Sequence, residues 1–178
     1  GCIIRGNSTS QGRWDPQRTG AGQERNLLGH DRRGAGSSAD CGITALALLA
    51  FLSAGHTHLD GDHRETVARG LEFLRASQTA DGSLAGNATL YERTYCHGMA
   101  MLALGEVVAM TGDAQLRDSL RQAVGWTVNA QNRIDGGWRY QPGDAGDMSQ
   151  FGWQVLGLRS AMLAGVEVPR ETRDGMSR

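Results

Sequence analysis

The sequence predicts an all-α fold of about three helical hairpins that repeat along the chain. An apolar segment recurs three times, with Gly42, Gly98 and Gly152 aligned at separations of 56 and 54 residues (98 − 42 and 152 − 98). Segments with a single apolar stripe alternate with these apolar segments, and strand patterns are nearly absent. A long period of this kind is typical of stacked repeats, in which each unit buries its apolar face against the next. We therefore predict an α/α toroid or partial toroid with buried inner helices and amphipathic outer helices.

The first helix of each unit is predicted to be buried on every side. The three segments are CGITALALLAFLSA (41–54), HGMAMLALGEVVAM (97–110) and FGWQVLGLRSAMLA (151–164). Apolar residues lie nearly all round each helix, which is typical of burial on all faces. Two sets of leucines align, and the first set is expected to lie in the core: Leu46, Leu102 and Leu156, then Leu48, Leu104 and Leu158.

The second helix of each unit is predicted to bury one stripe and leave its far side to solvent, because its apolar residues recur every three or four positions. The stripes are Val67, Leu71 and Leu74 in the first unit, and Leu120, Val124 and Val128 in the second. Residues that favour helix N-termini precede four of the helices. In chain order they are Ser37 or Ser38, Asp60 and Asp62, Asp113, and Pro169.

Residues 1–36 differ from the repeat domain that we assign to residues 37–178. They hold eight glycines, six arginines and three acids, for a local charge of +3 (6 − 3), and show neither a helical nor a strand period. We interpret them as an irregular arm, either a solvated segment against the domain or a contact for an acidic partner.

Length and composition exclude several classes of protein. A chain of 178 residues forms one domain or a piece of a larger protein. Its net charge of −1 does not support nucleic-acid binding, which usually needs a basic surface. The longest apolar run, 43–54, is shorter than the ~18 residues of a membrane helix, and no signal peptide is recognisable. The cellular compartment is therefore not determined.

Each unit ends in a sequence that resembles the QW repeat, Gln-x-x-x-Gly-x-Trp. The first copy is QTADGSL, with Leu84 in the Trp place, and the second is QNRIDGGW, with one extra residue before the glycine. A third segment, GDMSQFGWQVLGL, looks like the Ser-Gln-x-x-Trp opening of an inner helix. The chain thus resembles squalene-hopene cyclases and their relatives in the terpenoid cyclase and protein prenyltransferase superfamily.

The QW residues are expected to be structural in the first instance. A glutamine amide can satisfy backbone groups at a helix end, Asp-Gly turns the chain, and the tryptophan fills the gap to the next unit. The residues assigned to this role are Gln78, Asp81, Gly82, Gln131, Asp135, Gly136 and Trp138.

The resemblance implies a central apolar cavity, with the inner-helix N-termini gathered at one mouth. Aromatic rings line such cavities in the cyclases and stabilise carbocations through their π faces. The candidates for the mouth are Cys41, Tyr95, His97, Gln150 and Trp153. An apolar small molecule or another protein is the expected partner.

Asp40 is the candidate catalytic acid. Squalene-hopene cyclases protonate an alkene with Asp-x-Asp-Asp at the start of such a helix, and Ser38-Ala39-Asp40-Cys41 stands in that place here. Of the three aspartates in the cyclase motif, this sequence has only the middle one, Asp40. A single aspartate also suits a helix N-terminus as a cap, and we favour that interpretation.

Metal binding has two candidate sets of residues. Protein prenyltransferases hold zinc with Asp, Cys and His, but the Asp-x-Cys spacing of that family is absent around Asp40 and Cys41. The turn after residue 54 holds three histidines and two aspartates that could bind a divalent metal, but their spacing matches no known closed site: His56, His58, Asp60, Asp62 and His63. We therefore predict no metal and no cofactor, with zinc as the remaining alternative.

The sequence thus predicts a toroid module that binds an apolar ligand or another protein without catalysis. The alternatives are an active isoprenoid cyclase or transferase with Asp40 as the acid, and a scaffold domain. Full-length cyclases have many more helices, so we expect further repeats in a longer chain or a second copy.

Overall fold

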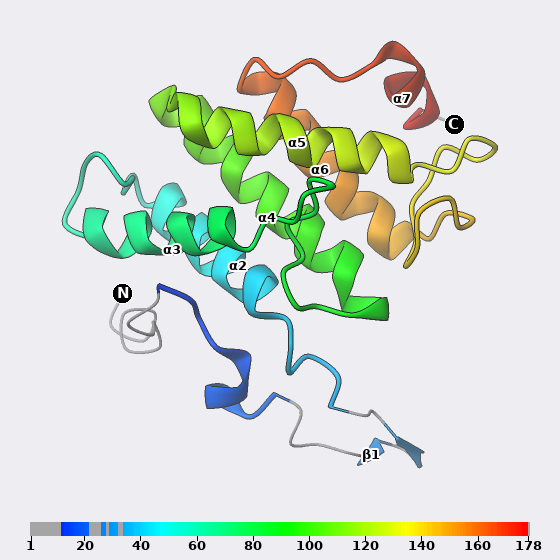
Figure 1. The fold of residues 1–178 in the computed structure, drawn as a ribbon, viewed down its shortest axis with the longest axis horizontal. Coiled ribbons are helices and arrows are strands. Elements are labelled where there is room, and N and C mark those ends of the chain that lie inside the picture. The colour runs from blue at the N-terminus through cyan, green and yellow to red at the C-terminus, as the bar shows by residue number, and fades with distance from the viewer. Residues whose placement is uncertain (1–11, 22–25, 28, 32–33, 178) are drawn as a thin grey trace.

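The computed structural model describes residues 12–21, 26–27, 29–31 and 34–177 (Figure 1). Its α-helices are α2 (Asp40–Ser53), α3 (Arg64–Ala76), α4 (Leu90–Thr111), α5 (Ala114–Ala130), α6 (Met148–Leu163) and α7 (Arg170–Gly175). The arm contains a short 3-10 helix, η1 (Pro16–Thr19), and the antiparallel two-residue strands β1 (Asn26–Leu27) and β2 (His30–Asp31). Residues 1–11, 22–25, 28 and 32–33 of the predicted arm lie outside the described part of the chain. The predicted all-α fold is confirmed.

The helices form two layers. Helix α4 packs between α2 and α6 in one layer, while α3 packs on α2, and α5 packs on α4 and α6 (Figure 1). These are the predicted inner and outer layers, arranged as successive hairpins. Among the described residues, no helix is both long and apolar enough to cross a bilayer.

The aligned glycines allow the inner helices to approach one another closely. A Cβ on Gly42 would lie 3.0 Å from Cys96 Sγ of α4, and a Cβ on Gly98 would lie 2.6 Å from Gln154 Nε2 of α6. The third glycine, Gly152, has nothing within 4 Å of that position. On α2 and α4, the aligned glycine therefore marks the side that meets the next inner helix.

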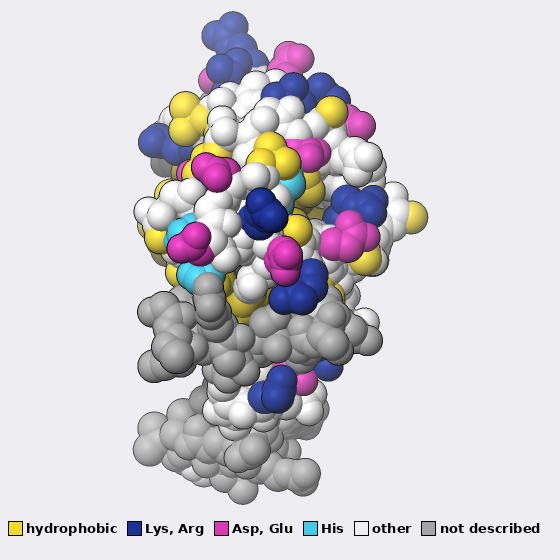
Figure 2. Space-filling view, turned by 90° about the vertical axis from the view of Figure 1, so that its left-hand side faces the viewer, with side chains coloured by type: hydrophobic (Ala, Val, Ile, Leu, Met, Phe, Trp, Pro, Cys, Tyr) yellow, Lys and Arg dark blue, Asp and Glu magenta, His cyan; other side chains and the backbone are white. Residues whose placement is uncertain are grey.

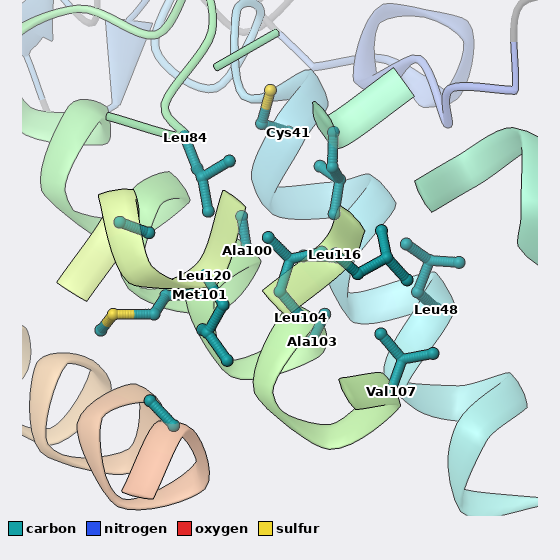
Figure 3. Close-up of a cluster of buried hydrophobic side chains, with 14 of the residues drawn as sticks. Cys41, Leu48, Leu84, Ala100, Met101, Ala103, Leu104, Val107, Leu116 and Leu120 are labelled. Atoms are coloured by element: carbon teal, nitrogen blue, oxygen red, sulfur yellow. The ribbon is translucent and has the colours of Figure 1, made fainter. Parts of the chain in front are cut away.

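The leucines in the core are the second aligned set. Leu48, Leu104 and Leu158 are each 0% exposed and belong to the continuous core, part of which is shown in Figure 3.

The prediction that the first aligned set lies in the core is wrong. Leu46 is 39% and Leu156 is 50% exposed, and Leu102 is half-buried. The two sets are two positions apart in the sequence. Because each residue turns an α-helix by about 100°, the two sets lie on nearly opposite sides of their helices. The side of each inner helix away from the outer layer is not covered by described residues, and these three leucines lie there.

The predicted starts of α2 and α3 are also wrong. Ala39 rather than Ser37 or Ser38 is the N-cap of α2. His63, not Asp60 or Asp62, is the N-cap of α3, and neither cap residue uses its side chain.

Asp113 does cap α5 as predicted, and its carboxylate accepts the Leu116 amide at 2.9 Å. Pro169 is the N-cap residue of α7, one position before the first turn. Helix α4 begins at Leu90, about two turns before the predicted start at His97.

The two QW glutamines make equivalent hydrogen bonds. Gln78 Nε2 donates to the carbonyl of Gly82 at 3.1 Å and to the carbonyl of Ser119 in α5 at 2.9 Å. Gln131 Nε2 donates in the same way to Gly136 at 2.8 Å and to Thr172 in α7 at 3.2 Å. Each amide therefore ties its own turn to the next outer helix.

The QW glycines lie against that same outer helix. Gly82 and Gly136 have φ of 93° and 75°, a conformation that favours glycine. A Cβ on Gly82 would collide with the Gln122 carbonyl of α5, and one on Gly136 with the Gly175 carbonyl of α7.

Gly12 in the arm lies against an outer helix as Gly82 and Gly136 do, which was not predicted from the sequence. Its φ is 83°, and a Cβ there would collide with the Arg69 carbonyl of α3. Trp14, two residues later, is 4% exposed and belongs to the core, as do Leu84 and Trp138 at the same place in the later turns. The arm therefore contributes a Gly-x-Trp turn of the repeat type.

Replacing Gln131 by methionine is expected to lower the free energy of unfolding by about 1–3 kcal/mol, because two buried carbonyls lose their donor while the side-chain volume is kept. Urea unfolding measures the change. The matched control is Gln122→Met on the exposed side of α5, expected to cost less than about 0.5 kcal/mol. Equal losses in both variants would contradict a linking role for Gln131.

Candidate functional site

The N-termini of α2, α4 and α6 are the part of the fold where the sequence predicts the mouth. Asp40 and Cys41 are the first two residues of α2, and Gln150 and Trp153 lie in the first two turns of α6. Tyr95 lies in the second turn of α4, and its hydroxyl lies 2.6 Å from Ser149 Oγ at the start of α6. The structure therefore joins the starts of α4 and α6 through polar side chains.

Asp40 forms an ion pair with the arm instead of capping its helix. Arg13 Nη1 donates to Asp40 Oδ2 at 2.6 Å, and Arg13 Nη2 also reaches Asp15 at 3.3 Å. Asp40 is the first residue of α2 and makes no side-chain cap bond, so the predicted cap is wrong. Burial raises the pKa of the Asp40 carboxyl, while the Arg13 guanidinium opposes this by stabilising the carboxylate.

A second carboxylate, Glu92, holds the segment that leads into α2. Its side chain accepts hydrogen bonds from the Gly36 amide and, at 2.9 Å, from the Ser38 hydroxyl. Neither Arg13 nor Glu92 was predicted from the sequence. The Gly-Arg-Trp sequence, which matches the Gly-x-Trp end of a QW repeat, was the available signal for Arg13.

The two cysteines at the mouth are buried thiols. Burial raises the pKa of Cys41 to about 11 and that of Cys96 to about 12. A thiol with such a pKa stays protonated at neutral pH and is a poor nucleophile or metal ligand.

His97 lies in the core rather than at an open mouth. Its ring is fully buried, its Nδ1 accepts the Leu84 amide at 3.0 Å, and its Nε2 lies 2.8 Å from the Thr127 hydroxyl. Burial lowers the pKa of His97 to about 3, so the ring is neutral and carries its proton on Nε2. His97 therefore connects the first QW turn to α5.

The residues of the predicted zinc alternative have different partners. Asp40 pairs with Arg13, Cys41 is buried at the start of α2, and His97 bonds to the first QW turn. Within the residues that the structure describes, no three His, Cys, Asp or Glu side chains are grouped in a way that would hold a metal ion.

The histidine-rich turn lies at one end of the layers, where Figure 2 shows histidine side chains beside acidic ones. The rings of His56 and His63 lie 4.6 Å apart, centre to centre, and His58 Nε2 lies 3.2 Å from the Asp113 carboxylate. His56 and His63 thus pack on each other, while His58 ties this turn to the cap of α5.

Two glutamines of α6 are buried against α4. Gln154 Nε2 donates to the Thr94 carbonyl at 2.9 Å. Gln150 is 0% exposed, and its amide has no hydrogen-bond partner among the described residues. Trp153, between them, is half-buried, and its Cβ lies close to Gly98.

The family model of the squalene-hopene cyclase C-terminal domain matches residues 37–172. The chain belongs to this family. No curated protein matches the sequence.

This squalene-hopene cyclase C-terminal domain exposes one face of each inner helix. We call this surface the inner face. On α2 and α4, exposed and half-buried residues recur every three or four positions, so they lie along one side of each helix. The positions on α2 correspond to those on α4 when the two repeats are aligned. On α6, the exposed leucines Leu156 and Leu163 lie seven residues apart, or about two helical turns. The apolar members of the inner face are Ile43, Leu46, Ala50, Met99, Leu102, Ala109, Leu156 and Leu163.

A groove of about 480 Å³ runs along the inner face between α2 and α4. Leu49, Leu52, Leu102 and Met110 give it apolar walls. Glu106 is the acidic residue in its lining, and its carboxylate accepts the Ser160 hydroxyl of α6 at 2.7 Å. Glu106 was not predicted from the sequence, although a lone carboxylate in an apolar helix is a recognisable signal of a functional residue.

Proposed function

We propose that this cyclase-type domain holds an extended apolar ligand on its inner face without using Asp40 as a proton donor. One observation carries the proposal: Leu46, Leu102 and Leu156 stand at the same repeat position and all lie on the uncovered side of the inner helices. Three equivalent leucines on adjacent helices offer continuous apolar contact to a long chain-like molecule. Ligand sites are typically concave and apolar with few polar groups, as the groove between α2 and α4 is.

The ion pair between Arg13 and Asp40 argues against proton donation by Asp40. Protonation of an unactivated alkene needs a carboxyl group that is protonated and strongly acidic. A guanidinium 2.6 Å away stabilises the carboxylate, and the neighbours of Asp40 in sequence, Ala39 and Cys41, supply no second carboxyl group.

An active cyclase that uses Asp40 as its acid is the second candidate. The observation in its favour is the direction of the Asp40 pKa, which burial raises above its ordinary value in spite of Arg13. A raised pKa keeps more of the protonated form available near neutral pH.

Binding of squalene tests the proposal. We expect the purified protein to retain squalene, measured by mass spectrometry after gel filtration. The double variant Leu46→Gln, Leu102→Gln should lose most of it, because polar amides interrupt the apolar contact. Leu59→Gln is the matched control, since Leu59 is 62% exposed in the turn after α2, away from the inner face. Equal retention by both variants would contradict binding on the inner face.

The same samples separate binding from catalysis. We expect no cyclic product from the wild type, and no change in squalene retention in Asp40→Asn. Cyclic product that the wild type forms and Asp40→Asn does not would establish the second candidate instead.

A further inference from the structure

Glu106 is the acidic residue in the groove between α2 and α4, and the repeat pattern does not require it there. The equivalent positions hold Ala50 on α2 and Ser160 on α6 (106 − 56 and 106 + 54). Glu106 is half-buried, and the other side chains that line the groove are apolar apart from Ser53. A charge taken partly out of water costs free energy unless a partner compensates it. The surroundings of Glu106 therefore decide what the groove can hold.

The close packing of α4 on α6 fixes the orientation of Glu106. A Cβ on Gly105 would lie 2.4 Å from Ser160 Oγ, so the two helices meet at this glycine. Ser160 Oγ donates a hydrogen bond to Glu106 Oε1 at 2.7 Å. No described residue donates a hydrogen bond to the second oxygen, Oε2. The protein thus holds one oxygen in place, and the other remains available to a group in the groove.

No basic side chain in the described part of the chain compensates Glu106. The groove is lined by neither arginine nor histidine, and the ion pairs among the described residues involve other acids. Arg159, one residue before Ser160, is exposed and stands at the repeat position of Gly105. Since Gly105 faces α6 and thus away from α2, we expect Arg159 to face away from α4 and from the groove.

The C-terminal ends of α2 and α4 add negative charge to the same part of the groove. Ser53, the last residue of α2, and Met110, one residue before the end of α4, both line it. The carbonyl groups at a helix C-terminus carry a partial negative charge, which a basic residue in the last turn offsets. Neither α2 nor α4 has a basic residue in its last turn, whereas α3 has Arg75. The groove therefore ends in a region of negative potential.

The rest of the inner face suits the apolar part of a ligand whose end group reaches Glu106. From Glu106 the half-buried positions continue toward the N-terminus of α4 through Leu102 and Met99, and α2 presents Leu46 and Ile43 at the equivalent places. The seven residues from Met99 to Glu106 (106 − 99) span about 10 Å along the helix. A linear alkyl or isoprenoid chain can lie along these side chains.

We propose that the groove takes an amphipathic cation, a linear apolar chain that ends in a protonated amine, and that Glu106 Oε2 accepts a hydrogen bond from the ammonium group. This inference rests on the proposed function, because the apolar chain lies on the same inner face. Charge complementarity selects the occupant. The acid and the two helix ends repel an anion, and a neutral alcohol forms a weaker hydrogen bond with Glu106 than a cation does.

Calorimetric titration with three dodecyl probes tests this inference, each used below its micelle concentration. The probes are dodecylamine, which is protonated at neutral pH, neutral dodecanol, and anionic dodecanoate. We expect the wild type to bind dodecylamine with a Kd about tenfold lower than that for dodecanol, and dodecanoate more weakly than either.

Glu106→Gln should remove the preference for the amine and leave the Kd for dodecanol unchanged. Glutamine keeps the volume of the side chain, and its Oε1 can still accept the Ser160 hydroxyl, so the packing of α4 on α6 is preserved. Glu65→Gln is the matched control, because it removes the same charge from the exposed side of α3. It should leave the Kd for all three probes unchanged.

Two results would overturn this inference alone: equal Kd values for dodecylamine and dodecanol in the wild type, or equal losses in Glu106→Gln and Glu65→Gln. The double variant Leu46→Gln, Leu102→Gln identifies a failure of the proposed function instead. It should weaken the binding of dodecanol as well as that of dodecylamine, because both use the apolar contact. Dodecanol binding that survives in this variant would contradict binding on the inner face, and both proposals would be overturned.

Discussion

Replacing Leu104 by alanine is expected to lower the free energy of unfolding by about 2–5 kcal/mol. Leu104 is 0% exposed at the centre of α4, where Figure 3 shows it among leucine and alanine side chains of the core. Truncation removes buried methyl groups and leaves a cavity that packed helices fill only in part. Urea unfolding monitored by circular dichroism gives the difference.

Leu102→Ala is the matched control on the same helix. Leu102 is half-buried and lines the groove of the inner face, so we expect its truncation to cost less than about 1.5 kcal/mol. A loss at Leu102 as large as that at Leu104 would show that the inner face is covered in solution, against the arrangement described here.

Acidification from pH 7 to pH 5 is expected to destabilise the protein, in part through His97. Burial lowers the pKa of His97 to about 3, while the unfolded chain titrates at its ordinary value near 6.5. Between these two values the unfolded state binds more protons, so stability falls as pH falls through 6.5 and is fully present above it. The expected contribution is up to about 1.4 kcal/mol per pH unit in this window.

His97→Gln isolates this contribution. Glutamine can accept the Leu84 amide and donate to the Thr127 hydroxyl, but it does not titrate. We expect the variant to be less stable than the wild type at pH 7, and the difference to shrink toward pH 5. A difference that stays constant across this range would rule out His97 as the titrating group.

Much of the architecture could be predicted from the sequence because it depends on local periodicity. Apolar segments with aligned glycines, alternating with striped segments, predicted the inner and outer helices in their observed order. The family match over residues 37–172 agrees with the resemblance that the two QW repeats carried. The amides of Gln78 and Gln131 bond to the carbonyls of their own turns, which a local motif can indicate.

The orientation of the inner helices could not be predicted in this way. A helix that is apolar nearly all round has no preferred side, so its sequence did not distinguish Leu46 from Leu48. Only the packing of α2 against α3 and α4 decides that Leu48 is buried and Leu46 lies on the inner face.

The chemistry at the mouth was likewise decided by tertiary structure. Asp40 meets Arg13, 27 residues earlier in the chain, and this contact converts an expected cap into an ion pair. His97 bonds to Thr127, 30 residues later, and is a neutral core residue instead of a residue at an open cavity mouth. The sequence by itself determined which segments are helical and where they repeat, because those properties depend on neighbours along the chain. Which side chains face one another across the repeats was left to the tertiary structure, because that depends on how separate helices pack.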